Sequence, residues 1–477
     1  MRAVGEVSTL PSRLLSTGLG TALGVALAAG CAGSVGVASP GSAPVGVHRA
    51  AQLPAQVPDR SSALAVLEPA DGDGPLPTAA GLSAALDPVL AQPAVGRRVG
   101  VAVADAATGR MLHSVAPDRG RIPASTTKLL TGAAALTTLD PAGRLTTRVV
   151  RGPRPRSIVL VGGGDPTLTR ATVRRQARGY PQPARLTDLA TSTAEALRRA
   201  GTTSVRLRVD DALFKGPAVS SEWKPTYVSA GVVGPVTALT ADGGRLLPGG
   251  RTRLPDPAVS TGESFAELLE ADGVRVTGRV RRTAVAADAR QLASVSSPPV
   301  AALVETMLAA SDNDVAEALA RQVALAEGEP ATFAGGAAAV AAALDRLGLD
   351  TAGLRLRDGS GLARGNRASP RLLTALLSRA ADPDQPRLRR LLSALPVAGF
   401  TGTLADRYDA PPAARGAGLV RAKTGTLLKV SALAGTVLDA DGRLLVFALL
   451  ADASPDVLAA ERELDRAATA LARCGCR

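Results

Sequence analysis

The stretch Ile122-Pro123-Ala124-Ser125-Thr126-Thr127-Lys128-Leu129-Leu130 leads into an alanine-rich apolar run that continues to about Leu139. This pattern predicts a helix that begins near Ser125. Residues three apart in the first turn share one face, so the Lys128 amine is expected beside the Ser125 hydroxyl. A helix N-terminus also offers unpaired N–H groups and a positive dipole end, which favour developing negative charge. Ser-x-x-Lys is a weakly specific motif by itself, but here it predicts a serine nucleophile next to a lysine.

Two hairpins are expected, one on each side of this helix in the chain. Each consists of two apolar segments separated by a short turn that contains glycine. The expected strands are Val99–Val103, Met111–Val115, Val430–Val437 and Leu444–Leu450. Helical periodicity is expected over Leu82–Leu90 before the first hairpin and over Asp456–Ala472 after the second.

Residues 146–291 have a different pattern, with many short β-like runs and frequent glycine and proline. A helix is expected there, over Leu186–Ala200. From Pro298 onward, helical patterns dominate until the second hairpin. We therefore expect residues 83–145 and 292–477 to form one domain, into which residues 146–291 are inserted.

The amino-acid composition argues against some classes of function, nucleic-acid binding in particular. The chain has 477 residues, of which 46% are apolar and only 2% aromatic, so its core must consist of alanine, valine and leucine. So few aromatic residues argue against stacking platforms for nucleic acid. The net charge of +13 is carried mostly by arginines spread along the chain, which indicates a solvated basic surface. We expect no nucleic-acid partner.

Histidine and cysteine are almost absent. His48 and His113 are the two histidines, which nearly excludes a histidine-based triad or a histidine-rich metal site. Cys31, Cys474 and Cys476 have neither zinc-ligand spacing nor a disulfide framework. We expect no metal and no cofactor, and Cys474-Gly475-Cys476 could simply be an exposed tail.

The N-terminus has the features of an export signal. Arg2 and Arg13 precede an uncharged apolar stretch, Leu14–Gly30, which is short for a membrane span. Cys31 follows a sequence similar to a lipoprotein cleavage box, so lipidation at Cys31, ordinary cleavage nearby and an uncleaved anchor all stay open. Residues 1–31 are thus a predicted signal, and residues 32–82, rich in Ala, Gly, Pro and Ser, a linker. We expect a protein exported to the cell envelope, with a membrane tether at the N-terminus as one alternative.

Two further short motifs follow the serine–lysine pair. Ser311-Asp312-Asn313 stands at the start of a helical run, where it could also be a simple helix cap. Lys423-Thr424-Gly425-Thr426 leads into a predicted strand, where its glycine permits a close backbone approach or a turn. Two of the five lysines in this arginine-rich chain lie in these motifs. Arginine cannot lose its proton near neutral pH, so a lysine that acts as a base cannot be exchanged for it.

Together, in this order and separation, the three motifs resemble the Ser-x-x-Lys, Ser-x-Asn and Lys-Thr-Gly signature of penicillin-binding proteins and serine β-lactamases. The long gap between Lys128 and Ser311 is similar to that of one branch, the D-alanyl-D-alanine carboxypeptidase/endopeptidases of the penicillin-binding protein 4 type (peptidase family S13). Residues 162–168, 358–367 and 400–404 also resemble that branch. The resemblance implies an α+β fold: a transpeptidase-like domain, with an antiparallel sheet flanked by helices, and a large, mostly-β insert after the nucleophile helix.

The resemblance also implies a serine-type D-Ala-D-Ala carboxypeptidase that acts on peptidoglycan stem peptides and binds penicillin covalently. In that scheme Ser125 attacks and Lys128 is the base. Ser311, linked to Lys128 and Lys423, relays the proton toward the leaving amine, and Asn313 binds the substrate amide. Burial and a nearby Lys423 cation would both lower the pKa of Lys128. The remaining implied roles are an oxyanion hole from the N–H groups of Ser125 and Thr426, carboxylate binding by Lys423 and Thr424 beside Gly425, and a side-chain pocket that includes Arg364.

Three alternatives remain open at this point. A serine β-lactamase shares the motifs but needs fast deacylation, and no distinct acidic deacylation motif is evident. A non-catalytic cell-wall scaffold would have no need of all the motif residues. A transpeptidase differs only in its acyl acceptor, although no glycosyltransferase domain accompanies the motifs.

Overall fold

The computed structural model describes residues 74–170, 181–286 and 288–475, all within one compact unit. The predicted signal, Cys31 and most of the predicted linker lie outside the described residues. Among the described residues, no helix is both long and apolar enough to cross a membrane, and no group of acidic, histidine and cysteine side chains could hold a metal ion.

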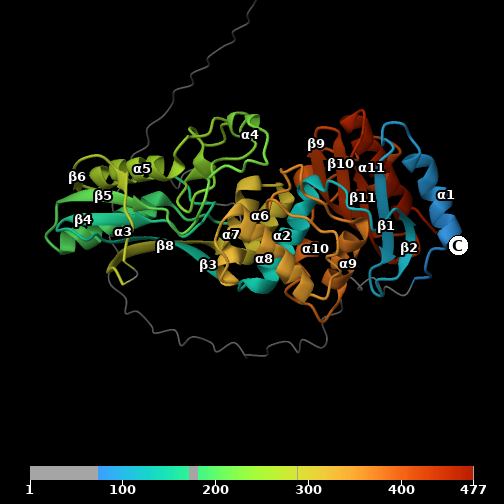
Figure 1. Ribbon diagram of the computed structural model, residues 1–477, viewed down its shortest axis with the longest axis horizontal. Helices are drawn as coiled ribbons and strands as arrows, with labels where there is room; N and C mark the ends of the chain where they lie inside the picture. Colours follow the sequence, from blue (N-terminus) through green and yellow to red (C-terminus); the bar gives the residue numbers. More distant parts are fainter. Residues whose placement is uncertain (1–73, 171–180, 287, 476–477) are drawn as a thin grey trace, which may run out of the picture. The chain divides into compact units, whose positions relative to one another are not determined.

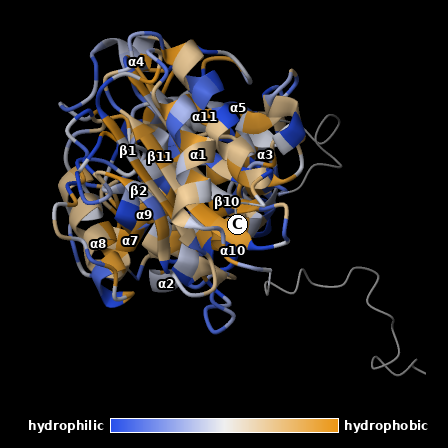
Figure 2. Ribbon diagram, turned by 90° about the vertical axis from the view of Figure 1, so that its right-hand side faces the viewer, coloured by the Kyte–Doolittle hydropathy of each residue, from blue (hydrophilic) through white to orange (hydrophobic). Residues whose placement is uncertain are grey.

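A five-stranded antiparallel sheet has the strand order β2-β1-β11-β10-β9 (Figure 1). Both predicted hairpins are present, and the first and last parts of the chain meet where β1 pairs with β11, for example Val101 opposite Leu449. β10 and β11 are almost entirely buried, and Figure 2 shows them as hydrophobic. The strands are β1 (Val99–Asp105), β2 (Met111–Val115), β9 (Val420–Leu427), β10 (Val430–Leu438) and β11 (Leu444–Ala451).

Helices cover both faces of this sheet. α1 and α11 pack together over one face, where Leu82, Phe447 and Leu464 share a core cluster. On the other face α6, α7 and α8 pack around α2 (Figure 1) in a second cluster of mainly Leu, Val and Ala. The helices are α1 (Ala79–Leu90), α2 (Thr127–Thr138), α6 (Val300–Ala309), α7 (Asn313–Ala326), α8 (Phe333–Arg346), α9 (Pro370–Ala381), α10 (Arg390–Ser393) and α11 (Val457–Ala472).

The segment after α2 builds a second, mixed sheet with strand order β6-β5-β4-β3-β8 and with β7 also paired to β5. Its core consists of branched side chains such as Ile158, Leu160 and Leu207, packed against α3 and α5. The helix predicted over Leu186–Ala200 is α3, but α5 was not predicted. The elements are β3 (Arg144–Arg151), β4 (Ser157–Val161), α3 (Leu186–Arg199), β5 (Ser204–Asp210), α4 (Thr226–Ser229), α5 (Pro257–Ala271), β6 (Arg275–Val276), β7 (Arg281–Arg282) and β8 (Gln291–Pro299).

The C-terminal segment differs from one expectation. Cys474 is only 4% exposed, packs in the cluster that contains α1 and α11, and is disulfide-bonded. Of the possibilities left open by the sequence, a simple exposed tail therefore does not describe Cys474, whose side chain packs just after the end of α11.

Candidate active site

The predicted serine–lysine pair lies where the chain enters α2. A single 3-10 turn, η2 (Ala124–Thr126), carries Ser125, and α2 begins two residues later at Thr127. Lys128 Nζ lies 3.0 Å from Ser125 Oγ, as expected from residues three apart in a first turn. The same nitrogen also donates to Asn313 Oδ1 at 2.7 Å and to the Ser360 carbonyl at 2.8 Å. Lys128 is fully buried, so these three oxygens take the place of its water shell.

The second motif joins this pair through α7. Asp312 caps the helix by accepting from Val315 N at 3.0 Å. The motif therefore does contain a helix cap, and the capping residue is its middle one. Asn313 bridges Lys128 to the insert, because its Nδ2 donates to the Val232 carbonyl at 2.9 Å. Asn313 thus contacts both Lys128 and the segment that contains Val232.

Ser311 does not form the links that the sequence reading implied. Among the described hydrogen bonds, none joins its hydroxyl to Lys128 or Lys423. Its φ is +55°, in the left-handed region that is costly for residues other than glycine. A strained backbone instead places Ser311 immediately before the cap of α7, and its relay role stays a prediction.

The third motif lies in β9, at the edge of the sheet. Gly425 packs directly against η2, since a Cβ there would come 2.8 Å from the Pro123 carbonyl oxygen. This close approach brings the motif beside the turn that carries Ser125. Lys423 Nζ donates to the Thr424 carbonyl at 2.9 Å, and Thr424 Oγ1 lies 2.9 Å from Thr403 Oγ1.

The remaining predicted residues lie at the outer side of β9. The Thr426 hydroxyl donates to the Glu461 carboxylate of α11. The Arg364 guanidinium donates to the Leu428 carbonyl at 2.7 Å, in the turn that ends β9. Arg364 is half-buried, and its charge is close enough to lower the pKa of Tyr227, although burial raises that pKa overall.

Burial sets the protonation of the two lysines. It lowers the pKa of Lys128 to about 8, against the opposing effect of the carboxylates of Asp358 and Glu317. The pKa of Lys423 is held well below its usual range, mainly by burial and also by repulsion from Lys128 and Arg407. Burial thus lowers the pKa of Lys128, as expected. The repulsion between the two lysines lowers the pKa of Lys423, whereas it was expected to lower that of Lys128.

A buried acidic loop that was predicted only as turns supports the site. Asp358 is fully buried and accepts four hydrogen bonds at 2.7 to 2.9 Å. The donors are Gly361 N, Ala363 N, Asn366 Nδ2 and Trp223 Nε1. An acidic residue followed by Gly-Ser-Gly is the sequence signal, because a carboxylate can collect the N–H groups of such a turn.

Replacing Asp358 by alanine should destabilise the fold strongly, since four buried donors lose their acceptor. Each unpaired buried donor costs about 1–3 kcal/mol and such costs are not fully additive, so we expect a loss of roughly 3–5 kcal/mol. Urea unfolding of the parent and of Asp358→Ala measures it. Asp118→Ala is the control, because that exposed carboxylate pairs with Arg371 at the surface and its removal should change the stability little. A loss no larger than in the control would contradict the role of Asp358.

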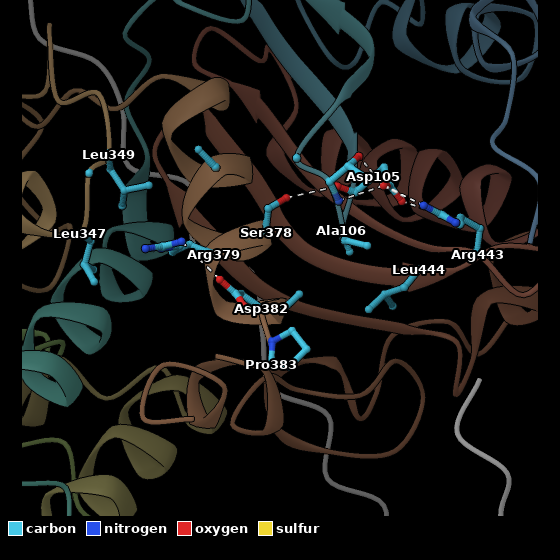
Figure 3. Close-up of a pocket in the computed structure, with 16 residues that line it drawn as sticks. Asp105, Ala106, Leu347, Leu349, Ser378, Arg379, Asp382, Pro383, Arg443 and Leu444 are labelled. Carbon is cyan, nitrogen blue, oxygen red and sulfur yellow. Dashed lines mark hydrogen bonds and ion pairs between the residues drawn. The ribbon is translucent and has the colours of Figure 1, made fainter. Parts of the chain in front are cut away.

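The pocket in Figure 3, with a volume of about 730 Å³, is a separate feature that includes none of the motif residues. Its charged groups are paired with one another. Arg443 holds Asp105 through two hydrogen bonds of 2.6 and 2.9 Å, and Arg379 pairs with Asp382 at 3.3 Å (Figure 3). The first pairing joins the end of β1 to the start of β11, and the second lies within the end of α9.

A buried lysine held against a serine, between a helix N-terminus and the edge strand of an antiparallel sheet, defines the penicillin-binding class of serine acyl-transfer proteins. Comparison with known proteins gives the particular family. The chain matches the D-Ala-D-Ala carboxypeptidase 3 (S13) family over residues 82–252 and 249–471, and it belongs to that family.

Individual relatives agree with this membership. A carboxypeptidase of Mycobacterium tuberculosis is 40% identical over 438 residues, which cover 90% of this chain and 92% of the relative. Carboxypeptidase DacB of Mycolicibacterium smegmatis is 38% identical, over 86% of this chain and 87% of the relative. The crystal structure of penicillin-binding protein 4 from Haemophilus influenzae is 21% identical, with a TM-score of 0.64, and covers 82% of this chain and 98% of that one. The predicted α+β fold and enzyme class, a serine-type D-Ala-D-Ala carboxypeptidase, are confirmed.

Proposed function

We propose that Ser125 is the nucleophile of this carboxypeptidase and that Lys128 is its general base. The observation that carries the proposal is the position of Lys128 Nζ, 3.0 Å from Ser125 Oγ and fully buried. In the neutral amine, two N–H groups can point to Asn313 and Ser360, which leaves the lone pair facing the serine hydroxyl. Lys128 would accept the Ser125 proton as the serine oxygen attacks the carbonyl carbon of the penultimate D-alanine.

The surrounding motif residues are assigned to binding. The N–H groups of Ser125 and Thr426 would stabilise the oxyanion, since η2 and β9 pack together at Gly425. Asn313 would hydrogen-bond the substrate amide, and Lys423 and Thr424 the terminal carboxylate. Ser311 would pass the proton to the leaving amine only after a rearrangement that brings its hydroxyl toward the lysines. Arg364 would meet a carboxylate of the stem-peptide side chain, because its partly exposed guanidinium lies at the end of β9.

The substrate we propose is a peptidoglycan stem peptide that ends in D-Ala-D-Ala, and β-lactams would acylate the same serine. Family membership and the relatives named D-alanyl-D-alanine carboxypeptidase support this substrate class. Such a substrate lies outside the cytoplasm, so we propose export through the N-terminal segment, with Cys31 as a candidate lipid anchor. That segment lies outside the described residues.

Two assays on the purified protein without residues 1–31 test the function. We expect a fluorescent penicillin to label the protein stably on a denaturing gel, and a D-Ala-D-Ala stem peptide to release D-alanine. Heat-denatured protein and a peptide without the terminal D-alanine are the controls. Transient label with consumption of the penicillin would favour a β-lactamase, and no label with intact penicillin would favour a scaffold.

The rate of penicillin acylation should depend on pH through Lys128. The base must be neutral, and its pKa of about 8 means that the neutral fraction falls about tenfold for each pH unit below that value. We therefore expect the acylation rate constant to rise with pH and to level off above about 8. Stopped-flow measurements from pH 6 to 9.5, with circular dichroism to verify the fold at each pH, check this. A flat profile would exclude Lys128 as the titrating base.

A further inference from the structure

Glu317 is a fully buried carboxylate that the mechanism above does not use. It lies on α7 one turn after Asn313 and is 1% exposed. Its two oxygens accept from two successive backbone N–H groups, Ser360 N at 2.8 Å and Gly359 N at 3.2 Å. Among the described hydrogen bonds, the Glu317 side chain makes these two. Both of them hold the backbone of the Gly359–Ser360 segment.

That piece of backbone is in direct contact with the base. The Ser360 carbonyl accepts from Lys128 Nζ at 2.8 Å, and the Gly359 carbonyl accepts from Thr131 Oγ1 at 2.7 Å, one turn further along α2. Gly359 has no room for a side chain, since a Cβ would lie 2.6 Å from the Ala320 Cβ. The Gly359–Ser360 segment is thus held from α2 and α7 at once.

We propose that Glu317 is a positioning residue for Lys128, acting through the Gly359–Ser360 segment; this rests on Lys128 being the base for Ser125. A neutral amine has two N–H groups and one lone pair. When Asn313 and Ser360 receive the N–H groups, the lone pair faces Ser125. Without Glu317, the Ser360 carbonyl could turn away, and the amine would lose the contact that fixes its rotation.

Charge gives Glu317 a second effect on the same lysine. The charged groups around it are Asp358 on the loop, Arg321 on α7 and Lys128 on α2, while the charged residues of α8 stand at its far end. Its negative charge raises the pKa of Lys128 against the effect of burial. Burial, followed by repulsion from Asp358, raises the pKa of Glu317 itself to about 7. Protonation places a hydrogen on one of the two carboxyl oxygens and makes that oxygen a weaker acceptor, so the hydrogen bonds to the Gly359–Ser360 backbone weaken below that pH.

The test is penicillin acylation of Glu317→Gln across pH. Glutamine keeps the size but turns an N–H₂ group toward one of the two backbone donors. We expect the plateau rate at high pH to fall about tenfold, as for a lost hydrogen bond to a charged group. Loss of the negative charge should also move the midpoint of the acid limb to lower pH. Glu327→Gln is the matched control at the other end of α7, where the carboxylate pairs with Arg346, and its rate and midpoint should equal those of the parent.

Thr131→Val is a second variant. It removes the hydrogen bond from Thr131 to the Gly359 carbonyl without changing any charge. We expect a lower plateau with an unmoved midpoint, and this variant decides the question if Glu317→Gln does not fold. If penicillin labels the parent and Glu317→Gln has the same acylation rate and the same pH midpoint as the parent, the inference about Glu317 fails but the proposed nucleophile stands. A lower rate that only parallels a lower melting temperature, with no midpoint shift, would also overturn it. An unlabelled parent would overturn the proposed nucleophile and this inference with it.

Discussion

The Ser125→Ala variant should carry no covalent penicillin and release no D-alanine from a stem peptide. Among the described residues, Ser125 Oγ is the one hydroxyl hydrogen-bonded to Lys128 Nζ, so its removal leaves the base without a nucleophile. The change deletes one partly exposed oxygen at the start of α2, and the fold should be unaffected. Labelling on a denaturing gel and mass spectrometry of the intact protein measure the result.

The matched control for that experiment is Ser114→Ala, an exposed serine on β2 that lies outside the motifs. It should label like the parent. A label on Ser125→Ala at the parent's level would move the nucleophile elsewhere, and peptide mapping of the labelled protein would locate it. Equal loss of label in both variants would instead indicate a general defect in folding.

Local patterns predicted the parts of the site that local geometry determines. The Ser125–Lys128 contact follows from helical spacing alone, and the β1–β2 hairpin follows from alternation and a glycine turn. The contact between Lys128 and Asn313 joins residues 185 positions apart. No spacing rule gives such a contact, so only the family resemblance could place the two motifs together.

Features that depend on tertiary packing were not predicted. Glu317 appears in sequence as an ordinary helix residue, because nothing local shows that α7 buries it against the Gly359–Ser360 segment. α5 was missed within a segment dominated by β-like runs and glycine. The conformation of Ser311 was missed because a positive φ at a serine is imposed by its surroundings, here the contact between the end of α6 and the start of α7.

Lys128→Arg should lower the acylation rate constant by about 10²–10⁴-fold, the usual contribution of a positioned base. Arginine keeps the positive charge and the capacity to donate hydrogen bonds to Asn313 and Ser360. It cannot lose its proton near neutral pH, so it cannot accept one from Ser125. Stopped-flow acylation of the parent and the variant with the same penicillin measures the difference.

The pH profile separates loss of the base from a simple misfit of the larger side chain in a fully buried position. In the parent, the rate should rise through the Lys128 pKa of about 8. In Lys128→Arg, the residual rate should have no such limb, because the group that titrated is gone. Lys215→Arg, at an exposed position, should retain both the rate and the limb. A variant that is slow yet still has a limb near pH 8 would show that another group is the base, and Lys423, whose pKa burial also lowers, would be the next residue to test.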